Sequence, residues 1–407
     1  MPIQIRKLRQ RALPIMALCG AALVSAGGTA PAAVAADIRS QQWYLQDMQA
    51  ENMWKTSKGK GVTVAVIDSG VNTELPELRG QVLAGVDFNK NPTGAHKDED
   101  GHGSNMAALI AGTGAEGGIQ GLAPEAKILP LKVKMYANSG VIDKMLSDAV
   151  RYAADHGARV INVSLAGKGV PAYYAKTQAA VTYALMKGSL IFAGVGNNGD
   201  KGNVPEYPAA LPGVVGVGAM DRHGSVTKWS AHGNQVALVA FGDELSEHCT
   251  KSEGICTAGG TSQATAITSG AAALIRAKHP EWTNNQVLRV MMETAGKPAK
   301  AKMPSTYLGY GSIRPRKVLV DGEGNPGPPD INPLTNAKTS TSASPSAAAT
   351  ESKNGDKAPA PSAEGADAKT VASKGGHTTV WLAIGAGVVV LAGLAVTLVL
   401  KRRRGSA

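Results

Sequence analysis

Between residues 37 and 320, apolar runs of strand length alternate with segments whose apolar positions recur at helical spacing. This alternation is typical of a parallel sheet covered by helices on both faces. Strands are predicted for VTVAVI at 62–67, KILPLKV at 127–133, ARVINVS at 158–164, SLIFAGV at 189–195 and GVVGVGA at 213–219. Helices are predicted to begin near His102, Val141, Ala172, Ser262 and Thr283. We therefore expect an α/β fold of three layers with a mostly parallel central sheet.

Each end of the chain carries a further apolar run. Residues 1–36 have a basic start, an apolar stretch from 12 to 24 and small residues ending in AVAA, which is the pattern of a secretory signal peptide. Residues 380–400 are uncharged and long enough to span a bilayer as one transmembrane helix. The basic tail at 401–407 is expected to stay in the cytoplasm, which places everything before the helix outside the cell. An apolar run followed by a basic tail can also belong to a wall-sorting signal. Such a signal would need an LPxTG-like motif before the run, and the sequence has none.

Residues 321–379 differ in composition from the segments on either side. They are rich in Pro, Ser, Ala, Thr and Lys and contain no aromatic residue. Such a segment cannot bury enough apolar surface to fold on its own. We predict a disordered linker that holds the domain at 37–320 away from the membrane.

The net charge of +11 is concentrated at the two ends of the chain. Four basic residues precede the first apolar run, four follow the last one at 401–404, and neither segment contains an acid. Residues 37–379 keep a charge of about +3, from 34 basic and 31 acidic residues. No basic stripe with interleaved aromatic residues remains, so the sequence gives no support for nucleic-acid binding.

Cleavage after residue 36 would remove Cys19 and leave Cys249 and Cys256 as an even pair in an exported chain. A disulfide that closes a small loop is the natural interpretation. A zinc site is disfavoured, because His248 is the one further ligand nearby and three ligands do not complete a tetrahedral shell. The sequence therefore identifies no metal ligand and no cofactor, and it leaves open whether the acidic run at 98–100 binds calcium.

Three short segments carry the candidate chemistry. Asp68 directly follows an apolar run, in the segment VIDSG. His102 lies between two glycines, and Ser262 lies in GGTSQAT, which begins at Gly259. A serine becomes nucleophilic when an imidazole takes its proton and a carboxylate orients the imidazole. Singly, Ser262 could be a helix cap and Asp68 a turn residue. Together they occupy a strand end and two helix starts, which can converge at the carboxyl edge of a parallel sheet.

Residues 194–199 match the GxGxxG pattern of dinucleotide-binding loops, and Asp221 follows at about the distance of a ribose-binding acid. No crossover helix fits before the proline-rich stretch KGNVPEYPAALPG, so a nicotinamide-dependent dehydrogenase is disfavoured. The amide of Asn197 in this loop is instead suited to donate to a developing oxyanion, together with the amide of Ser262. The acidic run at 98–100 is interpreted as a solvated loop, with Asp100 near the cap of the following helix.

These segments, the loop around Asn197 and the strand VINVSLAG resemble the subtilisin-like serine peptidase superfamily across residues 55–320. The segments at both ends and the stretch RSQQWYLQDMQAENMWKTSKGKGVTVAVIDSGV are similar to the mycosins, membrane-anchored proteases of actinobacterial type VII secretion. The resemblance implies a subtilisin-like fold and an extracytoplasmic serine endopeptidase. Ser262 would be its nucleophile, His102 its general base and Asp68 the orienting group. Its partners would be peptide substrates and subunits of a secretion complex.

The same resemblance implies where substrate would bind. Ser164, Leu165 and Ala166 would form an edge strand that pairs with an extended peptide, and Ser139 and Gly140 would flank the peptide on its other side. Backbone pairing of this kind suits an enzyme that acts on unfolded segments.

Several positions depart from the superfamily pattern. Ser104 replaces Thr, Ala166 replaces Gly, and Gln263 and Ala266 replace Met and Pro after the nucleophile. No catalytic group is lost, but narrow specificity and slow turnover are expected. The extension before the first strand is too short for a folded propeptide. The alternative function is a structural component that stabilises a membrane secretion complex, with proteolysis dispensable.

Overall fold

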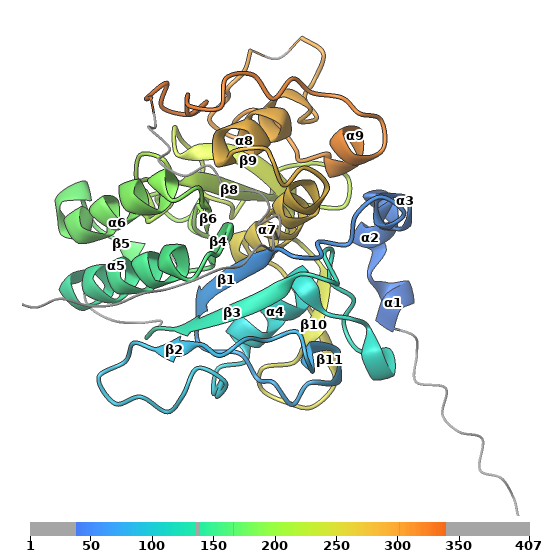
Figure 1. Cartoon of the computed structure of the whole chain (residues 1–407), viewed down its shortest axis with the longest axis vertical. Coiled ribbons are helices and arrows are strands. Elements are labelled where there is room, and N and C mark those ends of the chain that lie inside the picture. The colour runs from blue at the N-terminus through green and yellow to red at the C-terminus, as the bar shows by residue number, and fades with distance from the viewer. Residues whose placement is uncertain (1–37, 135–138, 166, 301, 339–407) are drawn as a thin grey trace, which may run out of the picture. The chain divides into compact units, whose positions relative to one another are not determined.

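The computed structural model describes residues 38–134, 139–165, 167–300 and 302–338 (Figure 1). The predicted signal peptide at 1–36, the transmembrane helix at 380–400 and the basic tail at 401–407 lie outside these ranges. Within them, no helix combines the length and the apolar character needed to cross a membrane.

A sheet of seven parallel strands forms the centre of the domain, in the order β2-β3-β1-β4-β6-β8-β9 (Figure 1). All five predicted strands are present, with ends shifted by at most two residues, and β2 and β9 are additional. The strands are β1 Thr63–Asp68, β2 Val86–Asp87, β3 Lys127–Lys132, β4 Val160–Val163, β6 Leu190–Gly194, β8 Val215–Met220 and β9 Val236–Phe241. The predicted α/β class with a mostly parallel sheet is therefore confirmed.

Helices cover both faces of this sheet. The principal ones are α4 His102–Ala111, α5 Ser139–Asp155, α6 Ala175–Met186, α7 Thr261–Lys278 and α8 Asn284–Glu293. Each predicted helix start lies within three residues of the observed one, because apolar spacing and caps mark it. Before α8, for example, the Thr283 side chain accepts from the Gln286 amide and the Gln286 side chain accepts from the Thr283 amide.

Successive residues of β1 point to different hydrophobic cores, as expected for a strand buried on both faces. Val64 and Val66 belong to the core shared with α4, α7 and α8. Ala65 and Ile67 belong to the core shared with α5 and α6. The three expected layers are thus a helical layer, the sheet and a second helical layer.

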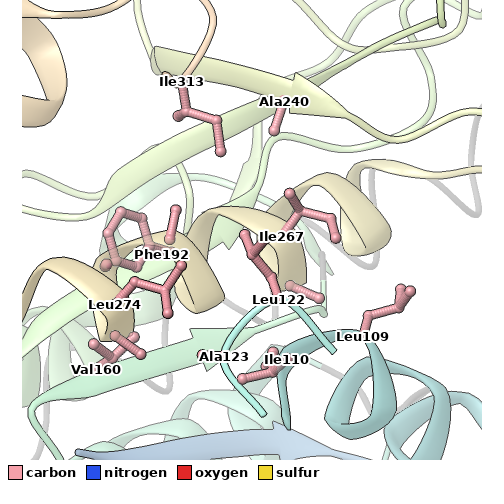
Figure 2. Packing of buried hydrophobic residues seen from close by; sticks show 14 of the residues in the cluster. Leu109, Ile110, Leu122, Ala123, Val160, Phe192, Ala240, Ile267, Leu274 and Ile313 are labelled. Atoms are coloured by element: carbon pink, nitrogen blue, oxygen red, sulfur yellow. The ribbon is translucent and has the colours of Figure 1, made fainter. Parts of the chain in front are cut away.

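The helix α7 lies in the centre of the larger core, where Ile267 and Leu274 pack beside Phe192 and Val160 of the sheet (Figure 2). Its small residues permit close packing, because a Cβ at Gly270 would already lie 3.1 Å from the Leu122 Cβ atom. From Thr261 to Arg276 every residue of α7 except Ser262 is buried. The helix is therefore buried along most of its length and leaves the candidate nucleophile partly exposed in its first turn.

The extension before β1 folds into three short helices, α1 Ile38–Gln41, α2 Trp43–Asp47 and α3 Ala50–Trp54, which the apolar pattern did not predict. The indole of Trp43 donates to the Glu244 carbonyl oxygen at 3.0 Å, and that of Trp54 donates to the Leu122 carbonyl oxygen at 2.8 Å. The extension is therefore packed against the core of the domain.

The shorter elements are the 3₁₀ turns η1 Pro76–Leu78, η2 Ala115–Gly117 and η3 Pro171–Tyr174, the strands β5 Gly167–Lys168, β7 Glu206–Tyr207, β10 Leu245–His248 and β11 Ile255–Ala258, and the helix α9 Pro315–Leu319. The strands β5 and β7 pair with each other, and β10 and β11 form an antiparallel hairpin.

The segment at 321–338 differs from the expected linker. Arg289 on α8 donates to the carbonyl oxygens of Pro326, Pro328 and Ile331 at 2.7 to 2.9 Å. The acceptors are backbone carbonyl oxygens, which every residue has. The amino-acid composition of the segment therefore could not reveal these hydrogen bonds. The ordered structure thus continues beyond residue 320, and the remainder of the predicted linker lies outside the described residues.

Candidate active site

The predicted site residues come from neighbouring strand ends and from two helix starts. Asp68 is the last residue of β1, and the register pairs Ile67 of β1 with Val163 of β4. Asp68 and Ser164 are therefore neighbours at the carboxyl edge of the sheet. His102 begins α4, and Ser262 lies in the first turn of α7.

Asp68 and His102 are in direct contact. The Nδ1 atom of His102 lies 2.8 Å from Oδ1 of Asp68. The carboxylate is fully buried and its Oδ1 atom also accepts from the Ser69 amide at 2.7 Å, whereas the imidazole is 23% exposed. Burial alone would lower the pKa of His102, but the charge and hydrogen bond of Asp68 outweigh burial and raise it above its ordinary value. The pair therefore favours the imidazolium form.

The two glycines beside His102 have separate structural reasons. Gly101 has a φ of +85°, in the left-handed region that favours glycine. A Cβ at Gly103 would collide with the Gly70 carbonyl oxygen. Together they let the first turn of α4 approach the end of β1 closely enough for His102 to reach Asp68.

The acidic run before α4 has a different role from the one predicted. Asp98 accepts hydrogen bonds from the Ser104 amide and hydroxyl at 2.8 and 2.6 Å and from the Ser69 hydroxyl at 2.8 Å. Asp98, and not Asp100, thus caps the first turn of α4 and links it to the residue after Asp68. Glu99 is exposed but pairs with the buried Lys132, so the interpretation as a solvated loop fits the exposure of Glu99 and Asp100, whereas Asp98 is engaged with α4.

The Ser262 hydroxyl points toward the end of β4, where it donates to the Ser164 carbonyl oxygen at 3.4 Å. The Ser164 hydroxyl in turn donates to the Ser262 carbonyl oxygen at 3.3 Å. Within the part of the chain that is described, the Ser262 hydroxyl forms no hydrogen bond with His102. Bonds between a nucleophile and its base are often long before substrate binds, so this geometry is compatible with His102 acting on Ser262.

Asn197 lies in the loop after β6 with its side chain exposed. Its Oδ1 atom accepts from the Thr261 amide at 2.9 Å, which fixes the side chain beside Ser262. Among the described residues its Nδ2 donor has no hydrogen-bond partner. The Ser262 amide is one of the first amides of α7, which have no acceptor within their own helix. Both donors lie near Gly260, where an added Cβ would be 3.4 Å from the Asn197 Nδ2 atom and 3.7 Å from the Ser262 amide nitrogen.

Two glycines of the 194–199 loop permit close packing, Gly194 against α7 and Gly196 against β7. A Cβ at Gly194 would lie 2.8 Å from the Thr261 hydroxyl oxygen, and one at Gly196 would lie 2.6 Å from the Glu206 carboxylate. The next element is the two-residue strand β7, so no crossover helix follows the loop. The dinucleotide-binding alternative therefore lacks the βαβ unit that it requires.

The predicted peptide-binding residues are placed only in part. Ser164 and Leu165 follow β4, and Leu165 has its side chain in the core beneath α5 and α6. Ser139 and Gly140 begin α5. A cavity of about 660 Å³ opens nearby, with Ser69, Asp100 and Val141 in its lining. Ala166 lies outside the described residues.

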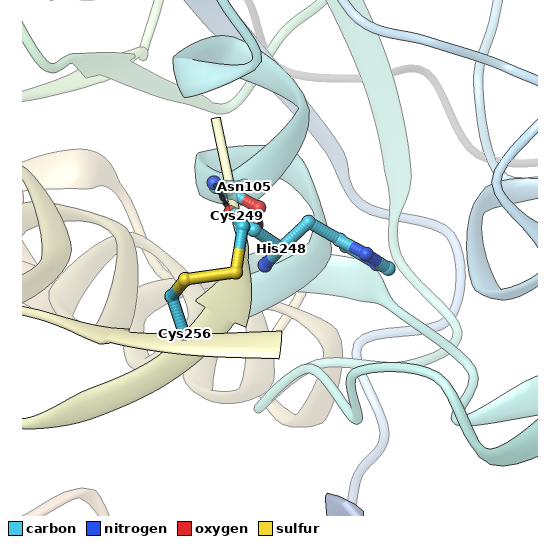
Figure 3. Close-up of a disulfide and its surroundings, with 4 residues drawn as sticks. All are labelled: Asn105, His248, Cys249 and Cys256. Atoms are coloured by element: carbon cyan, nitrogen blue, oxygen red, sulfur yellow. Dashed lines mark hydrogen bonds between the residues drawn. A yellow bond between two sulfur atoms is a disulfide. The ribbon is translucent and has the colours of Figure 1, made fainter. Parts of the chain in front are cut away.

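The disulfide joins Cys249 and Cys256 and closes the end of the β10–β11 hairpin (Figure 3). Asn105 of α4 holds this hairpin through its side chain, which donates to the His248 carbonyl oxygen at 2.9 Å and accepts from the His248 amide at 3.0 Å. The disulfide thus braces a hairpin that is attached to the helix carrying His102. No group of three histidine, cysteine or acidic side chains in the described ranges could hold a metal ion.

Sequence reasoning missed one carboxylate beside these residues. Glu247 on β10 is 8% exposed and accepts at 2.9 Å from Nε2 of Gln263, the residue after Ser262. The polar residue at position 263 was the available signal, because a buried amide side chain needs a partner.

The chain matches the model of the subtilase family over residues 59–311. It is 31% identical to thermitase of Thermoactinomyces vulgaris over 281 residues, which cover 69% of this chain and 96% of thermitase. This match spans nearly the whole length of the relative.

Two solved structures are similar to the fold. MycP1 from Mycobacterium smegmatis superimposes with a TM-score of 0.61 and 27% identity, covering 70% of this chain and 86% of that one. The MycP3 protease from a type VII (ESX-3) secretion system superimposes with a TM-score of 0.59 and 30% identity, covering 68% of this chain and 87% of that one.

Proposed function

Because this chain belongs to the subtilase family and is a serine endopeptidase, we propose that Asp68, His102 and Ser262 are its catalytic triad. The observation that carries the proposal is the 2.8 Å contact between the His102 Nδ1 atom and the Asp68 carboxylate at the edge of the sheet next to Ser262. The family gives the reaction class, and the geometry supports the role that we assign to each residue.

The chemistry follows from the hydrogen-bond partners. An ionised carboxylate accepts only, so Asp68 selects the tautomer of His102 that carries its proton on Nδ1. The Nε2 atom of His102 is then free to take the proton of the Ser262 hydroxyl and to deliver it to the leaving amine. As the hydroxyl oxygen attacks the peptide carbonyl, negative charge develops on the carbonyl oxygen. The Asn197 Nδ2 atom and the Ser262 amide would stabilise that charge.

The test is active-site labelling of the full-length chain and of Ser262→Ala with a fluorophosphonate probe, together with hydrolysis of an unfolded protein substrate. Wild type is expected to label once and to hydrolyse, and Ser262→Ala to do neither. Ser252→Ala, an exposed serine in the β10–β11 hairpin, is the matched control and should behave as wild type. Labelling that persists in Ser262→Ala would exclude Ser262 as the nucleophile.

We also propose that the peptidase acts outside the cell membrane, anchored by residues 380–400. The proposal is supported by the uncharged run at 380–400 and the basic residues that follow it. A chain that ends at residue 379 is expected in the soluble extracellular fraction with its peptidase activity intact. Retention of this shorter chain in the membrane would contradict the anchor.

Participation in type VII secretion is the remaining part of the proposal. It is supported by the likeness to MycP3, a protease of a type VII secretion system. The alternative is a mainly structural role in such a complex. The Ser262→Ala variant distinguishes this role from one that requires proteolysis. If secretion requires cleavage, this variant abolishes it, and if the structural role dominates, secretion persists without hydrolysis. Comparison of the cut sites in the proteins secreted by cells that carry the wild type and by cells that carry Ser262→Ala would identify substrates.

A further inference from the structure

Glu247 is a second carboxylate that is enclosed near the proposed triad. It lies on β10, is 8% exposed, and its Oε2 atom accepts from the Gln263 side chain at 2.9 Å. Gln263 is itself 5% exposed and directly follows Ser262. The position after the proposed nucleophile therefore holds a carboxylate in place.

The hairpin that carries Glu247 lies against α4 at one residue before His102 and at one residue after it. Thr250 lies beside Gly101, where an added Cβ would come within 3.4 Å of the Thr250 methyl group. Asn105, three residues after His102 and so on the same side of the helix, forms two hydrogen bonds with the backbone of His248. Glu247 is thus fixed between the first turn of α4 and the first turn of α7.

The charged groups around His102 come from three directions. Asp68 of β1 contacts the imidazole directly, and Asp100 in the loop before α4 and Glu247 on β10 lie near enough for their charges to act on it. Glu247 itself faces His102 and His248, and His248 is already engaged by Glu77. Among the described residues no lysine or arginine forms an ion pair with Glu247. A buried carboxylate without a permanent cation is costly, so a cation that forms nearby during the reaction would be stabilised by it.

Taking the proposed triad as its basis, we propose that Glu247 is a positioning residue that acts on His102. Held by Gln263, its carboxylate stabilises the imidazolium that forms when the Ser262 hydroxyl gives its proton to His102. Gln263 is then the residue that orients this second carboxylate. A polar side chain at position 263 is needed because it donates the hydrogen bond that holds Glu247.

The expected effect of Glu247→Gln has a defined sign. The substitution keeps the size of the side chain and an oxygen for Gln263, but removes a negative charge near His102. Loss of a nearby anion lowers the pKa of an imidazole. The acid limb of the pH profile of kcat/KM should therefore move to lower pH by about one unit. At the plateau kcat should fall by about 3- to 10-fold, since the imidazolium is less stabilised.

The experiment compares pH profiles of the full-length wild type, Glu247→Gln, Glu247→Asp and Glu253→Gln. Glu253 is an exposed carboxylate in the same hairpin and is the matched control for a change of net charge. Glu253→Gln should leave the acid limb at its wild-type position. Glu247→Asp keeps the negative charge, so its acid limb should lie between those of wild type and Glu247→Gln. A second readout is independent of turnover. In the Ser262→Ala background, the titration of His102 followed by NMR should move to lower pH when Glu247→Gln is added.

An acid limb and a His102 titration that are both unchanged in Glu247→Gln would overturn the proposal, as would an equal shift in Glu253→Gln. A fall in kcat alone, without either shift, would also contradict it, because a purely structural role predicts that result. The NMR titration does not depend on peptidase activity. If wild type neither labels nor hydrolyses, the proposed function fails while the effect of Glu247 on His102 is still measured.

Discussion

Asn197 is held by a single hydrogen bond that leaves its donor atom free for substrate. Its Oδ1 atom accepts from the Thr261 amide, so the side chain cannot rotate away without losing that bond. The Nδ2 atom thereby stays near Gly260, where an added Cβ would lie 3.4 Å from it. A side chain fixed in this way loses little freedom when an oxyanion forms, and such preorganisation would be the source of the catalytic effect that we propose for Asn197.

We expect Asn197→Ala to lower kcat by about 10²- to 10³-fold with little change in KM, because the lost donor acts on charge that develops only in the transition state. Steady-state hydrolysis of a short peptide substrate measures both constants. Asn197→Asp keeps an acceptor for the Thr261 amide and removes the donor, so it should be at least as slow. If Asn197→Asp kept wild-type kcat, the effect of Asn197→Ala would have to come from the loop and not from the oxyanion.

Single residues of the site were predictable to different degrees. Asp68 and His102 could be identified because a buried strand end and two flanking glycines mark them in the sequence. Asp98 could not, because an acid that caps α4 and an acid in a solvated loop have the same sequence signature. The pairing of Glu247 with Gln263 was hidden for another reason. It depends on a hairpin that follows β9 and folds back across the start of α7, and no local pattern encodes that contact.

The helix α4 connects the site to a second ion pair. Glu77 in η1 is fully buried and accepts from the His248 side chain, next to the backbone that Asn105 holds. Burial would raise the pKa of Glu77, but hydrogen bonds from His248 and from backbone amides, with the charge of His248, outweigh burial and lower it. The carboxylate form of Glu77 therefore ties η1 to the hairpin that lies against α4.

This arrangement predicts an acid-sensitive stability. Because the pKa of Glu77 is lower in the folded than in the unfolded protein, the contribution is complete above the unfolded pKa and is lost as the pH falls through the folded one. Glu77→Gln should lower the free energy of unfolding by about 1–3 kcal/mol at pH 7. The difference from wild type should shrink below about pH 4.

Urea unfolding of both proteins between pH 3 and pH 7 measures the effect. Glu74→Gln, an exposed carboxylate in the same loop, is the control and should follow wild type. A constant difference between Glu77→Gln and wild type across the whole pH range would show that the substitution disturbs packing and that the charge plays no part.

The elements of the domain were predictable where burial imposes a repeating pattern. The strand β1 and the helix α7 are buried along nearly their whole length, so their apolar or small residues mark them. The helices of the N-terminal extension were missed because each has at most five residues, too few for a helical period to be seen. Their stability comes from contacts distant in sequence, such as that of the Trp54 indole with the Leu122 carbonyl oxygen.

Both ends of the described chain are fastened to the peptidase core by polar contacts. In the N-terminal extension, the Trp43 indole donates to the Glu244 carbonyl oxygen at 3.0 Å, and after α3 the Ser57 hydroxyl donates to the Leu274 carbonyl oxygen of α7 at 2.8 Å. At the C-terminal end, the segment at 321–338 supplies carbonyl oxygens to Arg289 of α8, and the Asn325 amide donates to Glu293 at 2.7 Å. The order of the domain therefore extends past the last apolar helix, α9.

The segment at 321–338 should contribute measurably to the stability of the whole domain. A chain that ends at residue 338 keeps the carbonyl oxygens of Pro326, Pro328 and Ile331, whereas one that ends at residue 320 leaves the Arg289 guanidinium without them. We expect the shorter chain to be about 1–3 kcal/mol less stable and to melt several degrees lower. Thermal unfolding of both chains, with peptide hydrolysis as a check of the site, measures this.

Arg289→Ala identifies the source of the difference. If the carbonyl contacts carry the stabilisation, this substitution should lower the melting temperature of the chain that ends at residue 338 and have little further effect on the chain that ends at residue 320. Equal effects in the two chains would show that Arg289 stabilises α8 independently of the segment. The boundary of the cooperative unit would then lie near residue 320, where composition alone placed it, and the hydrogen bonds to 321–338 would be contacts that form without adding to the stability of the fold.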